Sequence, residues 1–279
     1  MNKLIDLHCH LLPGIDDGSD NLAMSLAMAR MASSDGITTI ACTPHILPGV
    51  YNNTGPQIRA AVAELQQRIS EAGIPITVVT GADVHIAPDL GIQLSQGRAL
   101  TLNDSRYLLL EPPHHLLPPR LEDLVFGLQT AGYVPVITHP ERLSWIEGGF
   151  DLIKRFVNNS VLMQITGGSL LGEFGRRPRY WAERMLDEGL CHLLATDAHK
   201  TDRRVPRLSE AYLLVAKRLG EEEAANLVRG RPEGILKDVS PAELPASLDA
   251  TATQMPSRAK TASTWSNIFK RVRRMAATQ

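Results

Sequence analysis

The chain has 279 residues, of which 43% are hydrophobic and 21% are charged, and its formal net charge is −1. This composition is typical of a globular protein with enough apolar material for a core, which excludes disordered chains and disulfide scaffolds. The three cysteines, Cys9, Cys42 and Cys191, lie far apart and lack the paired spacing of a structural zinc site. The N-terminal residues lack the apolar region of a signal peptide. The sequence also has no uninterrupted run of about 18 apolar residues, the length that a membrane-spanning helix needs. We therefore expect a cytoplasmic protein.

The charge is distributed unevenly along the chain. Residues 250–279 contain six basic side chains and no acidic one, so the first 249 residues carry 23 basic against 30 acidic groups. A nucleic-acid-binding domain is expected to be basic, so we expect no nucleic-acid partner for the main part of the chain.

The basic tail has a helical pattern of its own. Apolar side chains at helical spacing oppose its basic residues, which predicts a small amphipathic helix. We expect residues 258–274 to contact an anionic membrane surface or an acidic partner weakly, which would place the protein at the inner face of the membrane. The apolar residues of this pattern are Trp265, Ile268, Phe269, Val272 and Met275.

Short apolar, β-branched runs alternate with longer segments of helical period. This alternation is typical of βαβ units and predicts an α/β protein with a parallel sheet or barrel. Strands are expected at 3–9, 37–43, 75–81, 106–111, 133–138, 161–166 and 190–196. Helices are expected near 20–34, 56–72, 119–131, 150–158, 176–188, 205–219 and 221–229. From about Ser240 the composition turns to Ala, Ser, Thr and Pro, so we expect a domain over 1–239 and a flexible linker and tail over 240–279.

Imidazole and carboxylate side chains stand at the ends of six of the seven expected strands. One histidine at a strand end has little meaning, but side chains at the carboxyl ends of parallel strands share one rim, which is where barrels hold their active sites. Imidazole and carboxylate ligands, with no thiolate among them, are suited to Mn²⁺, Fe²⁺ or Zn²⁺ in open sites, and the set is large enough for two or three ions. The candidate residues are His8, His10, Asp17, His45, Asp83, Glu111, His139, Asp197 and His199.

The spacing of the first two histidines is informative. In a strand, side chains alternate between the two faces, so the rings of His8 and His10 point the same way. We expect Cys9, between them, to face the core.

Five short strings in this order resemble the PHP (polymerase and histidinol phosphatase) superfamily. They are DLHCH at 6–10, GIDDG at 14–18, TPH at 43–45, HPER at 139–142 and TDAH at 196–199. More narrowly, with QITGGSLLG at 164–172 as a sixth-strand segment, residues 3–239 resemble the bacterial CpsB/CapC/YwqE-type manganese-dependent protein-tyrosine phosphatases of capsule and exopolysaccharide loci. The resemblance implies a distorted (β/α)₇ TIM-like barrel, the PHP fold, and hydrolysis of phosphomonoesters.

The resemblance also implies a site with three cations, Mn²⁺ in the first place and Fe²⁺, Zn²⁺ or Mg²⁺ as alternatives. The implied ligand sets are His8, His10 and Asp197 for one ion, Glu111 and His139 for a second, and Asp17, His45 and His199 for a third. Asp83 would bridge the first two ions, although the family usually has Glu there. We interpret His85 as a wall residue in preference to a substitute ligand. The implied partner is a phosphotyrosine protein, the C-terminal tail of a tyrosine kinase of polysaccharide export.

The chemistry of such a site is consistent with phosphate ester hydrolysis. Clustered divalent cations lower the pKa of bound water and clamp phosphate oxygens, so hydroxide can attack phosphorus in line with the leaving phenoxide. Arg142 and Arg204 are candidates to bind the remaining phosphate oxygens, because a guanidinium fits two oxygens at once. Tyr51 could stack on an aromatic leaving group.

Four other functions are compatible with parts of this pattern. A cysteine-dependent tyrosine phosphatase needs an arginine six residues after its cysteine, and none of the three cysteines has one. An amidohydrolase barrel usually has a bridging lysine where this chain has Glu111. A histidinol-phosphate or other small-molecule phosphatase would share the metal chemistry, so it stays open. The non-enzyme alternative is a structural metal-binding interaction domain, which the nearly complete set of ligands disfavours.

Overall fold

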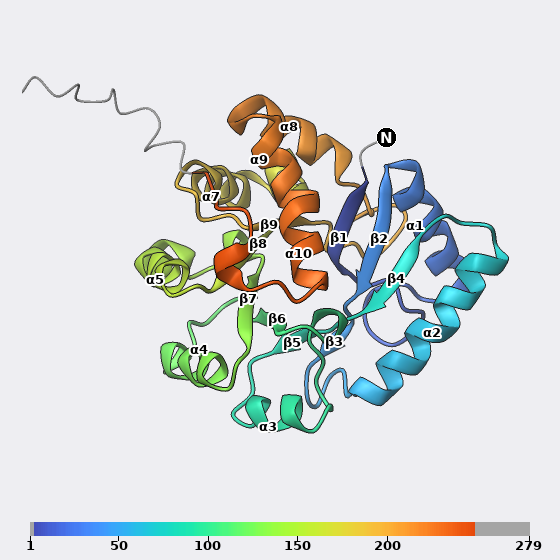
Figure 1. Ribbon diagram of the computed structural model, residues 1–279, viewed down its shortest axis with the longest axis horizontal. Helices are drawn as coiled ribbons and strands as arrows, with labels where there is room; N and C mark the ends of the chain where they lie inside the picture. The colour runs from blue at the N-terminus through green and yellow to red at the C-terminus, as the bar shows by residue number, and fades with distance from the viewer. Residues whose placement is uncertain (1–2, 249–279) are drawn as a thin grey trace, which may run out of the picture.

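The computed structural model describes residues 3–248, in which parallel strands occupy the centre and helices surround them (Figure 1). A three-stranded sheet has the order β1-β2-β4, and a six-stranded sheet has the order β3-β5-β6-β7-β8-β9. Every strand pairing within these sheets is parallel. The strands are β1 (Leu4–Cys9), β2 (Ile37–Cys42), β3 (His45–Ile46), β4 (Thr77–Thr80), β5 (Asp83–His85), β6 (Tyr107–Glu111), β7 (Val134–Thr138), β8 (Leu162–Thr166) and β9 (Leu193–Ala195).

The helices follow the strands and cover the outside of the sheets (Figure 1). In α2, Ile58, Val62, Leu65 and Ile69 recur at helical spacing and are all buried, which fixes the face that packs on the sheet. The helices are α1 (Leu22–Ser34), α2 (Gly55–Glu71), α3 (Leu90–Ser95), α4 (Leu121–Thr130), α5 (Ile146–Asn158), α6 (Gly167–Leu171), α7 (Arg176–Asp187), α8 (Ser209–Leu219), α9 (Glu221–Ala225) and α10 (Arg231–Leu236).

The two sheets are joined at the carboxyl ends of their strands. The second and third strands each continue beyond their predicted ranges after a short interruption, β2 into β3 and β4 into β5. Pro44 lies in the first interruption, where its missing N–H removes a ladder bond. On the other side of β1, the Asp197 amide donates to the His8 carbonyl at 2.8 Å, and the His10 amide donates to the Ala198 carbonyl at 2.9 Å. These bonds bring the carboxyl ends of β1 and β9 together.

The prediction of a parallel α/β fold is confirmed, and the differences from the predicted elements are local. Helices α3 and α6 were not expected, and α6 occupies part of the 164–172 string that was assigned to a strand. The helix predicted near 221–229 continues through a π turn at Asn226–Gly230 into α10. Pro232 does not stop it, because proline is tolerated in the first turn of a helix.

The described chain keeps contact with the domain beyond the expected boundary at Val239. The Arg231 side chain donates to the carbonyls of Pro245 at 2.7 Å and Ala246 at 2.6 Å, and the Ser247 hydroxyl donates to the Cys191 carbonyl at 3.4 Å. The predicted amphipathic helix over 258–274 lies outside the described residues. Between residues 3 and 248, no helix combines the length and the apolar character that crossing a membrane requires.

Candidate metal centre

The nine predicted ligands converge at the carboxyl ends of the strands, in buried or partly buried groups. Within each group, one ligand atom from every member lies within 4.8 Å of the others. The groups are His8, His10 and Asp197; His10, Asp17, His45 and His199; His8, Asp83 and His139; His45, His85 and Glu111; and Glu111, His114 and His139. Because neighbouring groups share members, they form one continuous cluster with room for more than one cation.

The first group is oriented by side chains behind it. The Nε2 atoms of His8 and His10 each lie 3.4 Å from Oδ1 of Asp197. Their Nδ1 atoms are held from the other side, by Oε1 of Gln164 and by Oδ2 of Asp16, both at 2.8 Å. A hydrogen bond to one ring nitrogen fixes the ring and directs the other nitrogen toward the centre, as metal-binding histidines require.

A second group lies nearer the surface. Oδ1 of Asp17 is 3.5 Å from Nε2 of His45 and 3.4 Å from Nε2 of His199. The Asp17 side chain is 48% exposed, so this end of the cluster is open to solvent. Nδ1 of His199 pairs with the backbone carbonyl of Asp197 at 2.9 Å, which leaves Nε2 facing Asp17.

Asp83 lies between the first group and His139, since His8, Asp83 and His139 form one of the groups. Its Oδ2 is 3.4 Å from Nε2 of His8 and 3.5 Å from Nδ1 of His45. The side chain is fully buried, and neither carboxylate oxygen has a hydrogen-bond partner among the described residues. A buried carboxylate without a partner is costly unless an ion balances it. The position of Asp83 and its unpartnered carboxylate oxygens are therefore those expected of a bridging metal ligand.

Glu111 gathers the remaining histidines. Its Oε2 lies 2.5 Å from Nε2 of His85 and 3.2 Å from Nδ1 of His45, while its Oε1 lies 3.4 Å from Nε2 of both His114 and His139. Burial would raise the pKa of Glu111, but the neighbouring histidines, first His114, hold it well below its usual value. Glu111 is therefore ionised.

Several other buried atoms that face the cluster lack a hydrogen-bond partner among the described residues. They are Nδ1 of His45, Oε2 of Glu111 and Nε2 of His199. Native proteins satisfy nearly all buried polar atoms, and an ion is one of the recognised partners. A set of imidazole nitrogens and carboxylate oxygens with open positions suits divalent cations such as Mn²⁺, Fe²⁺ or Zn²⁺.

The protonation of the first group follows from its carboxylates. Burial would lower the pKa of His8, but the charges of Asp83 and Asp197 outweigh burial and raise it. Burial would also lower the pKa of His10, but the charge of Asp16 outweighs burial and raises this pKa to about 10. These rings therefore carry protons that a bound cation would replace.

His139 and His199 have the opposite tendency. Burial, followed by the charge of Arg142, lowers the pKa of His139 well below 6.5. Burial, followed by the charge of His10, lowers the pKa of His199 to about 4. Both rings are therefore neutral, which is the form that binds metals.

Three residues at the site have left-handed backbone conformations. The φ angles are 35° at His139, 50° at Asp197 and 49° at Arg204. Such conformations are uncommon for residues other than glycine and cluster at functional sites. At these positions the backbone turns sharply just after β7 and β9, which directs the side chains across the strand ends.

Both predicted phosphate-binding arginines contact the outer oxygen of Asp197. The Arg142 guanidinium pairs with Oδ2 of Asp197 and lies over the Phe174 ring, 4.6 Å from its centroid. Arg204 is 2.6 Å from the same oxygen. Burial would raise the pKa of Asp197, but His8 and then Arg204 keep it well below its usual value. The two arginines therefore border the cluster, with Oδ1 of Asp197 directed inward.

Some functional side chains were missed by sequence reasoning. Asp16 and Gln164 orient the two histidines of the first group; Asp16 precedes the predicted ligand Asp17, and Gln164 begins the string at 164–172. His114 follows Glu111 by three residues, and that spacing was the available signal. Glu141 is fully buried and accepts from the Thr166 amide at 3.0 Å, which anchors the turn between His139 and Arg142.

The geometry adds contacts to two interpretations of individual residues. His85, interpreted as a wall residue, lies in direct contact with Glu111 and belongs to one of the groups. The ring of Tyr51, which could stack on a leaving group, is stacked on His45 in this structure, with 5.5 Å between centroids and 17° between the planes.

Comparison with known proteins identifies the family. Residues 4–237 match the family described as "Capsular polysaccharide synthesis, CpsB/CapC". The chain belongs to the CpsB/CapC family. It is 38% identical over 219 residues to the tyrosine-protein phosphatase YwqE of Bacillus subtilis, with 78% of this chain and 86% of YwqE covered. It is 32% identical over 209 residues to a putative tyrosine-protein phosphatase, CapC, of Staphylococcus aureus, with 75% of this chain and 82% of CapC covered.

Solved structures agree with this CpsB/CapC assignment. A chain from the crystal structures of YwqE from Bacillus subtilis and CpsB from Streptococcus pneumoniae, described as unique metal-dependent tyrosine phosphatases, superposes with a TM-score of 0.82. The two chains are 37% identical, and 85% of this chain and 96% of that chain are covered. An inactive dihydroorotase-like domain from Chaetomium thermophilum, at 12% identity and a TM-score of 0.52, shares the fold alone.

Proposed function

We propose that this CpsB/CapC protein is a metal-dependent protein-tyrosine phosphatase that acts in the regulation of capsular or exopolysaccharide synthesis. The observation that supports it most is the continuous cluster of buried imidazoles and carboxylates, with unpartnered atoms facing inward. The relatives named as tyrosine-protein phosphatases, and the related structures described as metal-dependent, point to the same activity.

The cluster residues would hold the cations. We assign His8, His10 and Asp197 to one ion, Glu111 and His139 to a second, Asp83 as the bridge between these two, and Asp17, His45 and His199 to a third. Bound divalent cations supply a water of lowered pKa and neutralise phosphate charge. Mn²⁺ is the ion that we propose, with Fe²⁺, Zn²⁺ and Mg²⁺ as alternatives, because the donors are imidazole and carboxylate.

Arg142 and Arg204 would position the phosphate. Each contacts Asp197 through part of its guanidinium, and each guanidinium has further N–H groups for phosphate oxygens. Two cationic side chains beside the metal cluster would keep the phosphate dianion in one orientation. A tyrosine leaving group has a pKa near 10, so its oxygen departs with less assistance than a serine alkoxide.

The cysteines take no part in this chemistry. Cys9, Cys42 and Cys191 are all buried, and burial raises the pKa of each thiol. A thiol of raised pKa that water cannot reach is a poor nucleophile. The proposed hydrolysis therefore uses no cysteine nucleophile.

The finer features of the proposal rest on the family resemblance. We infer a distorted (β/α)₇ barrel from the two joined parallel sheets and their surrounding helices. The proposed substrate is a phosphotyrosine protein, and the C-terminal tail of a tyrosine kinase of polysaccharide export is the partner that the resemblance favours. We also propose a cytoplasmic location, with residues 258–274 contacting the inner face of the membrane.

The test is a comparison of substrates with purified protein. We expect phosphate release from a phosphotyrosine peptide in the presence of Mn²⁺, with loss of activity after chelation and little change after thiol alkylation. His139→Ala should reduce kcat/KM by orders of magnitude, because it removes a proposed ligand. Phosphoserine peptide and histidinol phosphate serve as comparison substrates.

The comparison substrates decide between the alternatives. A marked preference for histidinol phosphate would reject the tyrosine phosphatase assignment and keep the metal site. Binding of metal without turnover of any phosphomonoester would instead favour a structural metal-binding domain.

A further inference from the structure

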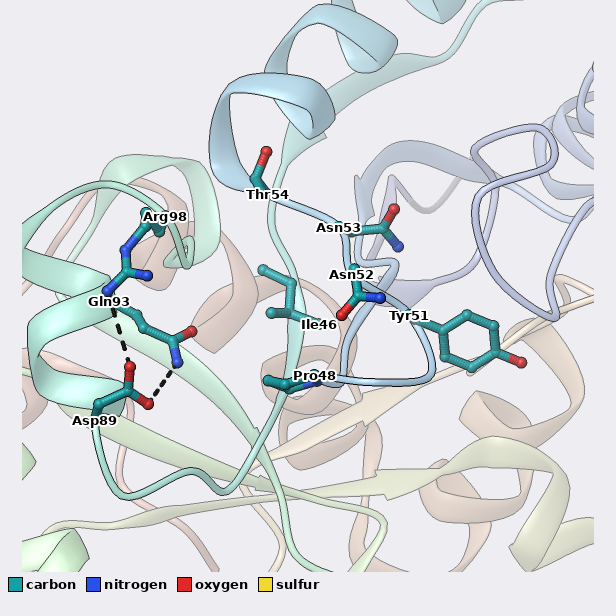
Figure 2. Close-up of a pocket in the computed structure, with 9 residues that line it drawn as sticks. All are labelled: Ile46, Pro48, Tyr51, Asn52, Asn53, Thr54, Asp89, Gln93 and Arg98. Atoms are coloured by element: carbon teal, nitrogen blue, oxygen red, sulfur yellow. Dashed lines mark hydrogen bonds and ion pairs between the residues drawn. The ribbon is translucent and has the colours of Figure 1, made fainter.

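A pocket of about 350 Å³ lies beside the metal centre and takes no part in the chemistry proposed above (Figure 2). One wall is the loop after β3, with Asn52 and Asn53, and the facing wall contains Asp89 and Gln93 of the α3 region and Arg98. Its volume is within the range of pockets that bind small ligands or parts of larger ones.

The pocket is connected to the metal centre through the β3 loop. Tyr51 lines the pocket, yet its ring stacks on the candidate ligand His45, and Figure 2 shows this ring directed away from the other pocket residues. The Asn53 amide donates to the carbonyls of Ile15 and His45, both at 2.9 Å. The pocket and the cluster are thus adjacent and held in a fixed relation.

The loop wall is preformed and offers a free donor. Leu47 and Tyr51 exchange two backbone hydrogen bonds, at 3.0 and 2.8 Å, which close the loop. The Asn52 side chain accepts from the Gly49 amide through Oδ1 at 2.8 Å. Its Nδ2 has no hydrogen-bond partner among the described residues, so its two N–H groups are available to a ligand.

The facing wall also offers donors. Gln93 donates to Oδ1 of Asp89 at 2.7 Å and fixes that carboxylate (Figure 2). Arg98 lies 3.8 Å from Oδ2 of Asp89, which is beyond hydrogen-bond distance, and its side chain is 51% exposed. The guanidinium of Arg98 therefore keeps its hydrogen-bonding capacity for a ligand with acceptor oxygens.

We propose that this pocket binds a residue that flanks the phosphotyrosine of a peptide substrate. Asn52 and Arg98 would donate from opposite walls to the acceptor oxygens of that residue, a backbone carbonyl or a side-chain carboxylate. Because Tyr51 separates the pocket from His45, a chain whose phosphotyrosine enters the cluster passes over Tyr51 into the pocket. The inference rests on the proposed phosphatase activity and adds a source of preference for peptides over small aryl phosphates.

Two variants test the pocket without altering the cluster. Arg98→Ala removes one set of donors. Asn52→Asp keeps the acceptor that holds the Gly49 amide and replaces the free donor with a negative charge. Arg59→Ala is the matched control, because Arg59 is a partly exposed arginine of α2 that pairs with Asp104 and does not line the pocket.

The measurement is kcat/KM with Mn²⁺ for two substrates, a short phosphotyrosine peptide with glutamate on both sides and 4-nitrophenyl phosphate. We expect each pocket variant to lower the peptide value by about three- to tenfold, mainly through KM, since each loses a hydrogen bond to substrate. The value for 4-nitrophenyl phosphate should stay within about twofold of the unmodified protein, as should both values for Arg59→Ala.

The outcomes separate this inference from the proposed function. Equal losses on both substrates, or unchanged peptide kinetics in both variants, would overturn the pocket assignment while leaving the phosphatase activity in place. If the unmodified protein hydrolysed neither substrate, the proposed function and the pocket would both be rejected. Thermal unfolding of every variant, with bound metal measured, shows whether an equal loss reflects misfolding, and in that case the second variant decides.

Discussion

Asp83 is the side chain whose surroundings depend most on a cation. Its two oxygens are buried between His8 and His45 without hydrogen-bond partners among the described residues. Asp83→Asn keeps the shape and removes the charge, so we expect less bound Mn²⁺ per chain. We also expect kcat/KM to fall by about a hundredfold or more, since even the loss of an outer partner of a metal ligand costs 10- to 100-fold.

The measurements are metal content and hydrolysis of 4-nitrophenyl phosphate. Asp123→Asn is the control, because that carboxylate is exposed and pairs only with Arg120 among the described residues. If Asp83→Asn retained the metal content of the unmodified protein, the bridge would have to be another carboxylate, and Glu111 is the next candidate. Asp83→Glu would then show whether the longer side chain usual in the family changes metal binding.

At the scale of single residues, the side chains that converge at the strand ends were more predictable than the side chains that orient them. His8, His10 and Asp197 could be predicted, because strand ends of a parallel sheet share one rim. Gln164 could not, because it reaches His8 only where the fold brings the ends of β1 and β8, which are far apart in sequence, to either side of β9. Likewise, the contact of Arg142 with Asp197 joins two loops that only the fold brings together.

Strands β8 and β9 are joined at their start by a histidine that must stay neutral. The Met163 amide donates to Nδ1 of His192 at 3.1 Å, just before β9 begins. Burial, followed by the charge of Arg231, lowers the pKa of His192 from 6.5 to about 4. The fold has its full stability from this histidine above pH 6.5 and loses stability as the pH falls toward 4, because the unfolded chain binds the proton more readily than the folded chain does.

His192→Asn tests this pH dependence. Asparagine keeps an acceptor for the Met163 amide but does not titrate. The stability advantage of the unmodified protein over this variant should therefore shrink by about 3 kcal/mol between pH 6.5 and pH 4, at 1.36 kcal/mol per pKa unit. Urea unfolding with a chelator present measures it, with His115→Asn, an exposed position, as control. A constant difference would mean that His192 takes up its proton in the fold as readily as in the unfolded chain.

At the scale of elements, the long periodic segments were predictable and the short irregular ones were not. Helices α2 and α7 lie within one residue of their expected ranges, whereas α5 begins four residues before and α8 four residues after the expected start. β3 has two residues and α6 has five, too few to give a periodic signal. The start of α6 is stabilised by Glu141, whose carboxylate accepts from the Ser169 hydroxyl at 2.8 Å, and no local pattern in the sequence indicates that contact.

For the whole molecule, residues 241–247 matter because they cover a buried charge. Arg231 is 1% exposed and pairs with Glu223 at 2.9 Å. Its remaining donors reach the carbonyls of Pro245, Ala246 and His192. Composition alone assigned this segment to a linker, because alanine, serine and proline give no sign that their backbone carbonyls serve a distant arginine.

Two shortened chains would measure this contribution, one ending after Val239 and one after Leu248. Both lack 249–279, so their difference reports on residues 240–248 alone. The shorter chain should be less stable by about 2–4 kcal/mol, because hydrogen bonds to a charged group contribute about 1.5–3 kcal/mol each and water replaces part of the loss. Urea unfolding provides the free energies.

Substituting Arg231 in both shortened chains identifies the cause. With Arg231→Met there is no guanidinium to satisfy, so the difference between the two chains should become smaller than it is with arginine. An unchanged difference would assign the effect to packing of residues 241–247, and two chains of equal stability would restore the boundary at Val239. Both chains should hydrolyse 4-nitrophenyl phosphate while folded, since the hydrogen bonds of Pro245, Ala246 and Ser247 go to Arg231 and Cys191 and to none of the cluster residues.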